Sequence, residues 1–385
     1  MISADVSCRL LEVDFSGIEA VLTGRQLWAH GIDVDGARQY IRLARLGMHA
    51  AVTALKLGRP IDLSQPDDVV KSLLDEVKHG YPLEYDRSKR TVHAKNFGMT
   101  VFGQVETFPE YFPTIKVAQE FEDFYYALAP GLPTWHQALR KHARDTGKLG
   151  GTTLSPAVPT IWDHPYGYQH WFWDVLNYQP CNDFTARKWL NDVTRKHRIV
   201  QLHGRYFKVN FGGDANRVIA YYPQSIAAGR LKEAECYPPD GLFWPESPYY
   251  IGDAYFGRTP LLGPIHDSLL LHIPNRCWDR VVEKVAYVMQ RPSEYLPIPS
   301  DWGMGTYLPI GVSAKAGRNW AEAIDVDKQI QIKLKYNVDV RVNEGGMEEI
   351  EIPTWVESAG SDLPTLLPEG TGEEETWTML QRAVT

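Results

Sequence analysis

The sequence predicts a mixed α/β (α+β) protein, because short apolar runs with strand character occur among long segments of helical periodicity. The runs 10–13 and 269–273 are typical of buried strands, and the alternating segment 198–213 predicts a β-hairpin. Apolar residues recur at helical spacing in six further segments: 36–57, 67–79, 114–128, 134–146, 225–235 and 278–289. We therefore expect helices and strands in one fold.

Bulk composition indicates an ordinary soluble globular protein. Of 385 residues, 44% are apolar and 23% are charged. No apolar run reaches the ~18–20 residues that a membrane-spanning helix needs, and the four cysteines, Cys8, Cys181, Cys236 and Cys277, form no CxxC pair. We therefore expect no membrane partner, no zinc knuckle or disulfide framework, and a cytoplasmic location, which is the host cytoplasm if a phage encodes the chain.

The net charge of −8 is concentrated towards the C-terminal end. Residues 339–385 contain 11 acidic and 2 basic residues, a net charge of −9, which leaves +1 for residues 1–338. The last residues are rich in Glu, Pro, Gly and Thr with little periodicity, so we predict that 326–385 is an acidic, largely disordered tail. The remaining chain is free to carry basic surfaces such as 195–198, although a solvated basic face is the simpler explanation of that cluster.

The first ordered segment places an aspartate at a transition from strand to helix. The apolar run that contains Leu10 and Val13 is followed directly by Asp14, and Ser16 then offers a helix N-cap before Ile18. Functional groups are often found at such transitions, because a rigid scaffold holds the connecting loop in place.

A second aspartate, Asp267, stands with His266 directly before the apolar run 269–273. This pair is explained either by a polar turn before a strand or by a carboxylate held at the tip of a hairpin. Two carboxylates from different strands can hold two divalent cations ~3.5–4 Å apart. Oxygen ligands with room for phosphate and water suit Mg²⁺. Asp14 supplies the other carboxylate that the metal hypothesis requires.

Five segments resemble the motifs of the family A (DNA polymerase I-like) nucleotide polymerases and occur in the family's order. "VDFSGIE" resembles motif A, "RTVHAKNFGMTVFG" resembles motif B on the fingers helix, and "IHDS" resembles motif C. "YPQSIAAGRLKEA" is similar to the helix that follows the minor groove of the primer–template, and "LPIGVSAKAGRNWAEA" to the C-terminal strand. These segments are 13–19, 90–103, 265–268, 222–234 and 308–323. The resemblance implies the palm and fingers of a phage-like polymerase.

The resemblance assigns roles to residues of the palm. Asp14 and Asp267 would bind two Mg²⁺ ions, for which Mn²⁺ could substitute, and the backbone carbonyl of Phe15 would be a further metal ligand. His266 would lie near the primer terminus. Gln224 would donate to acceptors in the minor groove, which every base pair offers, so this contact carries no sequence preference.

Two further residues are expected at the nucleotide. Glu19 stands at the family's steric gate, where a carboxylate packed under the sugar excludes a ribose 2′-oxygen; the alternative is an exposed helix glutamate. His49, in "GMHAAV", resembles the family's phosphate-contacting histidine, although a histidine on a helix surface explains it nearly as well.

The fingers helix should present basic residues to the triphosphate and an aromatic residue to the nascent base pair. We expect Arg90, Lys95 and Phe102 to bind the nucleotide, together with Phe97. However, the usual lysine position, counted from Arg90, is occupied by Ala94, so Lys95 is one residue late.

One residue corresponds to 100° on an α-helix, so this offset changes the face of the helix. Either the helix contains a local bulge, or a second register built from Lys89, His93 and Phe97 faces the nucleotide. Both registers remain open on the sequence alone.

Motif C departs from the family, because Ser268 replaces the usual glutamate. The sequences "HDS" and "MTVFG" are closer to phage-type single-subunit RNA polymerases, whereas Glu19 favours deoxynucleotides. We therefore expect a DNA-directed DNA polymerase that acts in DNA replication, a nucleotidyltransferase whose partners are a DNA primer–template and dNTPs. The alternatives are an RNA polymerase or primase-like enzyme on the same palm, and a non-catalytic nucleic-acid-binding scaffold.

The expected domains are a palm portion at 1–50, helical fingers at 51–150, a palm portion with insertions at 151–325 and the tail at 326–385. The palm would be an antiparallel sheet with Asp14 and Asp267 side by side. Because Asp14 lies so near the first residue, we expect no thumb and no exonuclease in this chain. It would then be the catalytic part of a split or truncated polymerase, with a second polypeptide supplying both.

Overall fold

The structure, a computed structural model, describes residues 7–151, 161–190, 198–255, 257–318 and 348–352. These residues belong to one compact unit, and it is a mixed α/β fold with antiparallel sheets, as predicted. The boundaries expected at 50, 150 and 325 stay a prediction. Within the described part of the chain, no helix is both long and apolar enough to cross a membrane.

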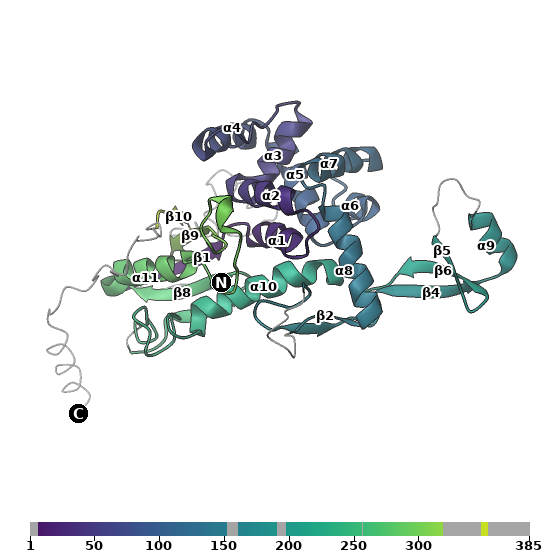
Figure 1. Cartoon of the computed structure of the whole chain (residues 1–385). Coiled ribbons are helices and arrows are strands. Elements are labelled where there is room, and N and C mark those ends of the chain that lie inside the picture. The colour runs from purple at the N-terminus through teal and green to yellow at the C-terminus, as the bar shows by residue number, and fades with distance from the viewer. Residues whose placement is uncertain (1–6, 152–160, 191–197, 256, 319–347, 353–385) are drawn as a thin grey trace, which may run out of the picture. The chain divides into compact units, whose positions relative to one another are not determined.

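The central sheet has five antiparallel strands in the order β10-β9-β1-β8-β7 (Figure 1). Their bounds are β1 (Cys8–Phe15), β7 (Leu261–Ile265), β8 (Ser268–Pro274), β9 (Val312–Gly317) and β10 (Glu348–Ile350). Strand β1 alternates in the way that a half-buried strand requires: Val13 and Phe15 are buried, whereas Glu12 and Asp14 on the other face are partly exposed.

Strand β10 lies within the predicted acidic tail, of which the structure describes only residues 348–352. Glu348 to Ile350 pair with Ala316 to Ala314 of β9 and add an edge strand to the central sheet. The rest of the predicted tail lies outside the described residues.

Ten helices among the described residues accompany this sheet. They are α1 (Ile18–Ala29), α2 (Val34–Leu46), α3 (Met48–Lys56), α4 (Asp67–Gly80), α5 (Pro82–Asn96), α6 (Val101–Thr107), α7 (Ile115–Leu128), α8 (Leu132–Thr146), α10 (Arg217–Cys236) and α11 (Trp278–Gln290). Helix α1 packs against α2 and α10. The single helix predicted at 36–57 is wrong, because Gly47, at a φ of 139°, separates α2 from α3. The predicted N-cap Ser16 is also wrong, because α1 begins after Gly17, in a left-handed conformation.

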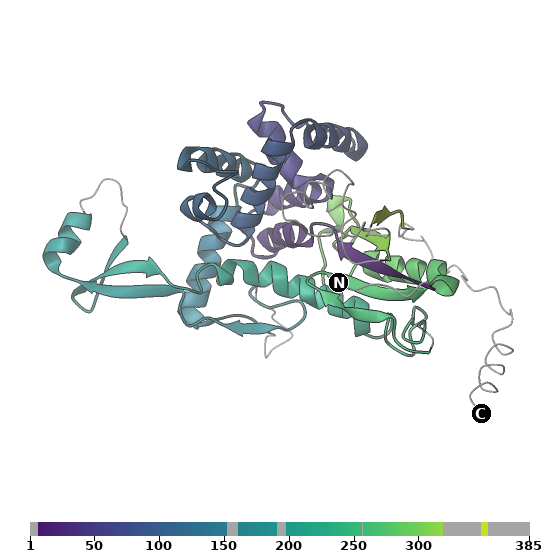
Figure 2. The same ribbon diagram turned by 180° about the vertical axis from the view of Figure 1, so that it is seen from behind.

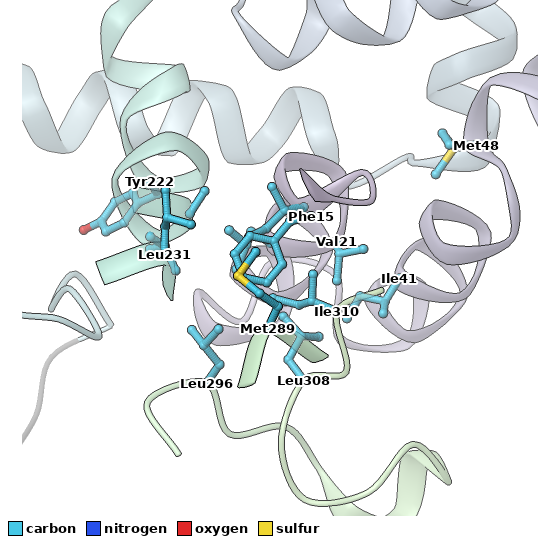
Figure 3. Packing of buried hydrophobic residues seen from close by; sticks show 14 of the residues in the cluster. Phe15, Val21, Ile41, Met48, Tyr222, Leu231, Met289, Leu296, Leu308 and Ile310 are labelled. Carbon is cyan, nitrogen blue, oxygen red and sulfur yellow. The ribbon is translucent and has the colours of Figure 1, made fainter. Parts of the chain in front are cut away.

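The core joins the end of β1 to α10 and to the C-terminal part of the fold. Figure 3 shows Phe15 of β1, Val21 of α1 and Tyr222 of α10 in one cluster of buried side chains with Met289 of α11. Each of these residues is almost fully excluded from solvent. Packing of this kind fixes the positions of β1 and α10, which carry three of the residues predicted to act on substrate.

The predicted fingers helix is broken at Gly98, with α5 before the break and α6 after it. Gly98 has a φ of 67°, and its N–H donates to the Lys95 carbonyl, while the Met99 N–H donates to the Ala94 carbonyl. This pair of hydrogen bonds is a Schellman C-cap, which ends a helix on a left-handed residue. A Cβ at Gly98 would lie 2.4 Å from Ile219 Cδ1, so glycine is also required by packing. The motif B segment therefore contains a helix end instead of a bulge.

A smaller sheet lies between α8 and α10 in the sequence. It has the order β4-β6-β5, with β4 (Leu176–Cys181), β5 (Arg198–Leu202) and β6 (Arg205–Phe211), and α9 (Asp183–Leu190) contacts β5 and β6. We call residues 176–190 and 198–211 the arm; Figure 2 shows its strands and helix, in teal, from behind. The hairpin predicted at 198–213 is confirmed. Its turn is His203–Gly204, and both residues have a positive φ, as a two-residue type I′ turn requires.

Candidate active site

Strand pairing brings Asp14 and Asp267 together. Asp14 is the penultimate residue of β1 and pairs with Ser268, the first residue of β8. Asp267 precedes Ser268 in the two-residue turn between β7 and β8, and its carbonyl accepts a hydrogen bond from the Phe15 N–H at 3.3 Å. His266, the other turn residue, has a φ of 55°, a conformation in which few non-glycine residues are found. The turn therefore holds Asp267 beside the end of β1.

The electrostatics of Asp14 show how close the two carboxyl groups are. The pKa of Asp14 is raised to about 7, first by burial and then by the negative charge of Asp267 and a hydrogen bond between the two side chains. The charge of Glu12 raises this pKa further, whereas Lys315 lowers it. The two aspartates thus form one hydrogen-bonded pair.

Glu12 and Lys315 also belong to this site, and neither was predicted from the sequence. Glu12 lies two residues before Asp14, on the same face of β1, and pairs in register with Lys315 of β9. The Ser268 hydroxyl lies 3.4 Å from Glu12 Oε1 and donates to it. Strand β1 therefore places the Glu12 carboxylate beside Ser268. In the family that the sequence resembles, a glutamate stands at the position of Ser268. Strand periodicity around Asp14 was the signal that could have identified Glu12.

Glu19 and Gln224 meet at the same place. Glu19, in the first turn of α1, lies close enough to the Gln224 side chain of α10 for that side chain to lower its pKa. Burial raises the pKa of Glu19 most, the charge of Asp267 raises it further, and Gln224 and His266 lower it. The structure thus brings together four side chains from three of the five motif segments, with His266 exposed beside them.

The donor set at this site fits Mg²⁺. No group of three or more His, Cys, Asp or Glu side chains among the described residues is arranged to hold a metal ion by itself. Mg²⁺ commonly uses one or two carboxylates and takes its other ligands from water and substrate phosphates. Asp14 and Asp267 offer two carboxylates in a partly buried place, where two ionised groups repel each other and a divalent cation would remove the repulsion. The Phe15 backbone lies at the same strand end.

Two residues of the second fingers register, Lys89 and His93, lie near His49. Burial lowers the pKa of His49 to about 4, and the charges of Lys89 and His93 lower it further, so these groups are near neighbours. Lys89 and His93 are exposed and lie one turn apart on α5. The rings of His93 and Phe97 are 4.7 Å apart. His49 is therefore close to the exposed face of α5 that carries the second register.

Arg90 and Lys95, which the first register uses, are engaged elsewhere. The guanidinium of Arg90 stacks on the rings of Tyr111 and Phe108, at 4.0 and 4.9 Å from their centres. Lys95 is buried and forms an ion pair with Glu122 of α7. The structure brings neither side chain to the aspartate pair.

Phe102 follows the helix break and lies on α6. Its side chain is 65% exposed, whereas Phe97 at the end of α5 is half-buried. Gly98 separates the two aromatic residues, so they do not share one helix face.

Similar proteins were found only among solved structures. No family model matches the chain, and no curated protein matches it. Among solved structures, the chain is similar to one described as the POL domain of Pol1 from M. smegmatis in complex with DNA primer-template and dNTP. The TM-score is 0.45 and the sequence identity is 15%, and the match covers 82% of this chain. The chain spans 41% of the length of that solved chain.

Proposed function

We propose that this protein catalyses template-directed DNA synthesis, transferring a nucleotide from a dNTP to the 3′-hydroxyl of a primer. The observation that carries this proposal is the meeting of Asp14, at the end of β1, with Asp267, in the turn before β8, next to Glu19 and Gln224. These residues come from sequence segments more than two hundred positions apart. Their convergence supports the roles that the sequence resemblance implies.

Asp14, Asp267 and the Phe15 carbonyl are the groups that would hold two Mg²⁺ ions. The ions would lower the pKa of the primer hydroxyl and neutralise charge on the triphosphate. The protein's own contribution is to hold two carboxylates in place at a strand end and a tight turn, which lowers the entropic cost of assembling the site. Glu12 and Lys315, paired across β1 and β9, set the local charge around Asp14.

Glu19 and Gln224 would act on the sugar and on the base pair. Glu19 lies beside Gln224 and near Asp267, so its carboxylate stands close to the aspartates and would exclude a 2′-hydroxyl. Gln224 retains exposed polar atoms that could donate to minor-groove acceptors. Discrimination would therefore concern the sugar and the shape of the base pair.

The triphosphate would be bound by the second register, with Lys89 and His93 of α5 and His49 of α3. Lys89 and His93 are exposed, and both lie close enough to His49 to lower its pKa. The exposed Lys89 can reach an anionic ligand without breaking an internal ion pair, which Lys95 would have to do. Burial lowers the pKa of His93, so its neutral ring would donate a hydrogen bond.

RNA synthesis is the second candidate function, because Ser268 stands in the motif C position that phage-type RNA polymerases fill with serine. A second polypeptide that supplies a thumb is part of the proposal for either activity, because duplex DNA needs a gripping element.

The test is primer extension with Mg²⁺ by wild-type protein and by the Asp14→Asn and Asp267→Asn variants, with dNTPs and rNTPs compared. We expect extension with dNTPs and a loss of roughly a thousandfold or more in both variants. Asp68→Asn, at an exposed aspartate of α4, is the matched control and should extend as wild type does. Glu19→Ala should admit rNTPs.

Binding of Mg²⁺–dNTP, measured by calorimetry, is the second readout, because it requires no thumb. Wild type and Asp68→Asn should bind, and Asp267→Asn should bind at least about tenfold more weakly. Undiminished extension and binding by both folded aspartate variants would reject the proposal. Extension with rNTPs by wild type would assign RNA synthesis instead.

A further inference from the structure

Two tryptophans before the arm form an exposed pair of stacked rings. The rings of Trp171 and Trp173 are nearly parallel, with 9° between their planes and 5.7 Å between their centres. They are 47% and 82% exposed. Lys148 Nζ lies 5.6 Å from the centre of the Trp171 ring. We call Lys148, Trp171 and Trp173 the tryptophan platform.

The backbone around the platform is firmly held. Phe172, between the two tryptophans, is buried, and its N–H donates to the Gly147 carbonyl at 2.7 Å. The N–H of Trp173 donates to the carboxylate of Asp214, which also accepts from the next residue. Phe172 is buried, whereas Trp171 and Trp173 on either side of it are exposed. The tryptophans are therefore exposed by a fixed backbone, and an exposed indole pair at a fixed position indicates a binding surface.

The arm that follows the platform is basic and carries further exposed aromatic residues. The described residues 169–190 and 198–211 contain five Lys and Arg and two Asp, a net charge of +3 in a chain whose net charge is −8. Among the described residues of the arm, the exposed cations are Arg187, Lys188 and Arg205, and the exposed aromatic side chains are Tyr178 and Phe184. Charge and aromatic surface thus occur together.

This combination selects one class of partner. Single-stranded nucleic acid presents phosphates to cations and free base faces to aromatic rings, and stacking on such rings tolerates any sequence. A duplex keeps its base faces stacked internally, so it could use the cations but not the two indoles. A protein interface would favour aromatic anchors with few charges at its centre, which a local excess of lysine and arginine does not match.

We propose that the tryptophan platform and the arm bind single-stranded DNA. Bases stack on Trp171 and Trp173, and the phosphates run past Lys148 towards Arg187 and Arg205. The preference for a single strand follows from the platform itself. The choice of DNA over RNA rests on the proposed function, in which an unpaired template strand must be held near the enzyme.

The test measures equilibrium binding of a fluorescent oligothymidylate of about 20 nucleotides by anisotropy, without Mg²⁺ or dNTP. Stacking of a base on an aromatic ring is worth enough that Trp173→Ala and Trp171→Ala should each weaken single-strand binding by about tenfold. A duplex of equal length should bind both variants as it binds wild type. Trp244→Ala is the matched control, because Trp244 is also partly exposed but lies outside the platform and the arm.

Salt dependence tests the cations separately. Removing one interaction between a cation and a phosphate of a single strand lowers the slope of log K against log salt concentration by about 0.7. Arg205→Gln should therefore reduce the slope by about that amount, whereas Lys71→Gln, at an exposed lysine of α4, should leave it unchanged.

Three results would overturn the proposal. The first is equal single-strand affinity in wild type, Trp171→Ala and Trp173→Ala. The second is equal weakening for single strand and duplex, which would show that the tryptophans do not act by stacking. Tighter binding of an RNA strand of the same length would reject the choice of DNA. Because no catalysis is needed, these results are independent of whether Asp14 and Asp267 support synthesis.

Discussion

Lys89 and Lys95 lie on the same helix, α5, in opposite environments. Lys95 is buried against Glu122, and burial lowers the pKa of its ammonium group while Glu122 raises it. Its Nζ also donates to the Met99 carbonyl at 2.8 Å, beyond the helix end. Lys89 is exposed near His49. The two lysines therefore have different functions, one in stability and one available to a ligand.

We predict opposite effects when each lysine is replaced by methionine. Lys95→Met leaves Glu122 largely buried without its cation and should lower the free energy of unfolding by about 3 kcal/mol. Lys89→Met should change stability by less than about 0.5 kcal/mol but raise KM for dNTP roughly tenfold, because the variant cannot make a charged hydrogen bond to phosphate. Urea unfolding and steady-state extension measure the two effects. If KM for dNTP rises in folded Lys95→Met but not in Lys89→Met, the first register would bind the triphosphate and the second would not.

The motif residues of the site could be proposed from the sequence, and strand periodicity around Asp14 also points to Glu12, but Lys315 could not be predicted. Asp14, Asp267, Glu19 and Gln224 each stand in a recognisable motif, and the structure brings them together. Lys315 is identified only by its pairing with a strand about 300 positions earlier in the chain. Such long-range register is not encoded in any local pattern.

At the scale of elements, the break between α5 and α6 determines what each part of motif B can reach. Gly98 ends α5 with a left-handed residue, and Thr100 then caps α6 through its hydroxyl, which accepts from the Gly103 N–H. The side chain of Phe102 on α6 is therefore oriented independently of Lys89 on α5. The close approach of Gly98 to Ile219 joins this break to α10, the helix of Gln224.

We predict that Gly98→Ala destabilises the fold more than Gly31→Ala does. Both glycines have a positive φ, 67° and 63°, so both substitutions carry the left-handed strain of about 1 kcal/mol. Only at Gly98 does the new Cβ meet an atom, Ile219 Cδ1, whereas nothing lies within 4 Å at Gly31. The additional loss at Gly98 should be about 1–3 kcal/mol in urea unfolding. Equal losses in the two variants would mean that α10 is not packed against the break.

The sequence predicted the existence of most elements better than their ends. The hairpin at 198–213 was predictable because His203–Gly204 is a local turn signal. The merged helix at 36–57 and the continuous fingers helix were not, because Gly47 and Gly98 are tolerated inside helical patterns and act as breaks only in their tertiary context. Element ends of this kind depend on packing, as Ile219 shows for Gly98.

At the scale of the whole molecule, the site depends on strands from distant parts of the chain. Strand β1 begins at Cys8, and its two neighbours, β8 and β9, begin at Ser268 and Val312. Closing such long loops carries an entropic cost that only the completed core repays. Conditions that weaken the core should therefore remove the aspartate pair as well.

Buried histidines make this core sensitive to acid. His30, His136 and His164 are each less than 10% exposed, and burial lowers their pKa values to about 4, 3 and 4. His30 Nδ1 lies 2.9 Å from both Trp135 Nε1 and the Gln26 carbonyl oxygen, whereas its Nε2 is buried without a hydrogen-bond partner among the described residues. A second proton on this ring would therefore leave a buried N–H unpaired. The unfolded chain, with histidine pKa values of about 6.5, binds more protons than the folded one between pH 6.5 and 4.

We predict that the free energy of unfolding falls as the pH is lowered from 7 to 5, by about 2 kcal/mol for each of these histidines. The sign follows from the lowered pKa values: the stabilisation is complete above pH 6.5 and is lost progressively towards pH 4. The raised pKa of Asp14 acts in the opposite direction, since its folded form takes up a proton near pH 7. Protonation of Asp14 therefore offsets only part of the free energy of unfolding that is lost through the three histidines.

Urea unfolding at pH 7, 6 and 5 measures this dependence, and His136→Gln should flatten it by about 2 kcal/mol, because glutamine takes up no proton on unfolding. His79→Gln, at an exposed histidine of α4, is the control and should keep the wild-type slope. A slope that His136→Gln leaves unchanged would mean that the buried ring is protonated in the folded protein, so that acid must weaken the core elsewhere. If His136→Gln does reduce the slope, we expect primer extension to be lost below pH 6 at the same pH values as the folded structure. Protonation of the buried histidines would then set the lowest pH at which the enzyme is active.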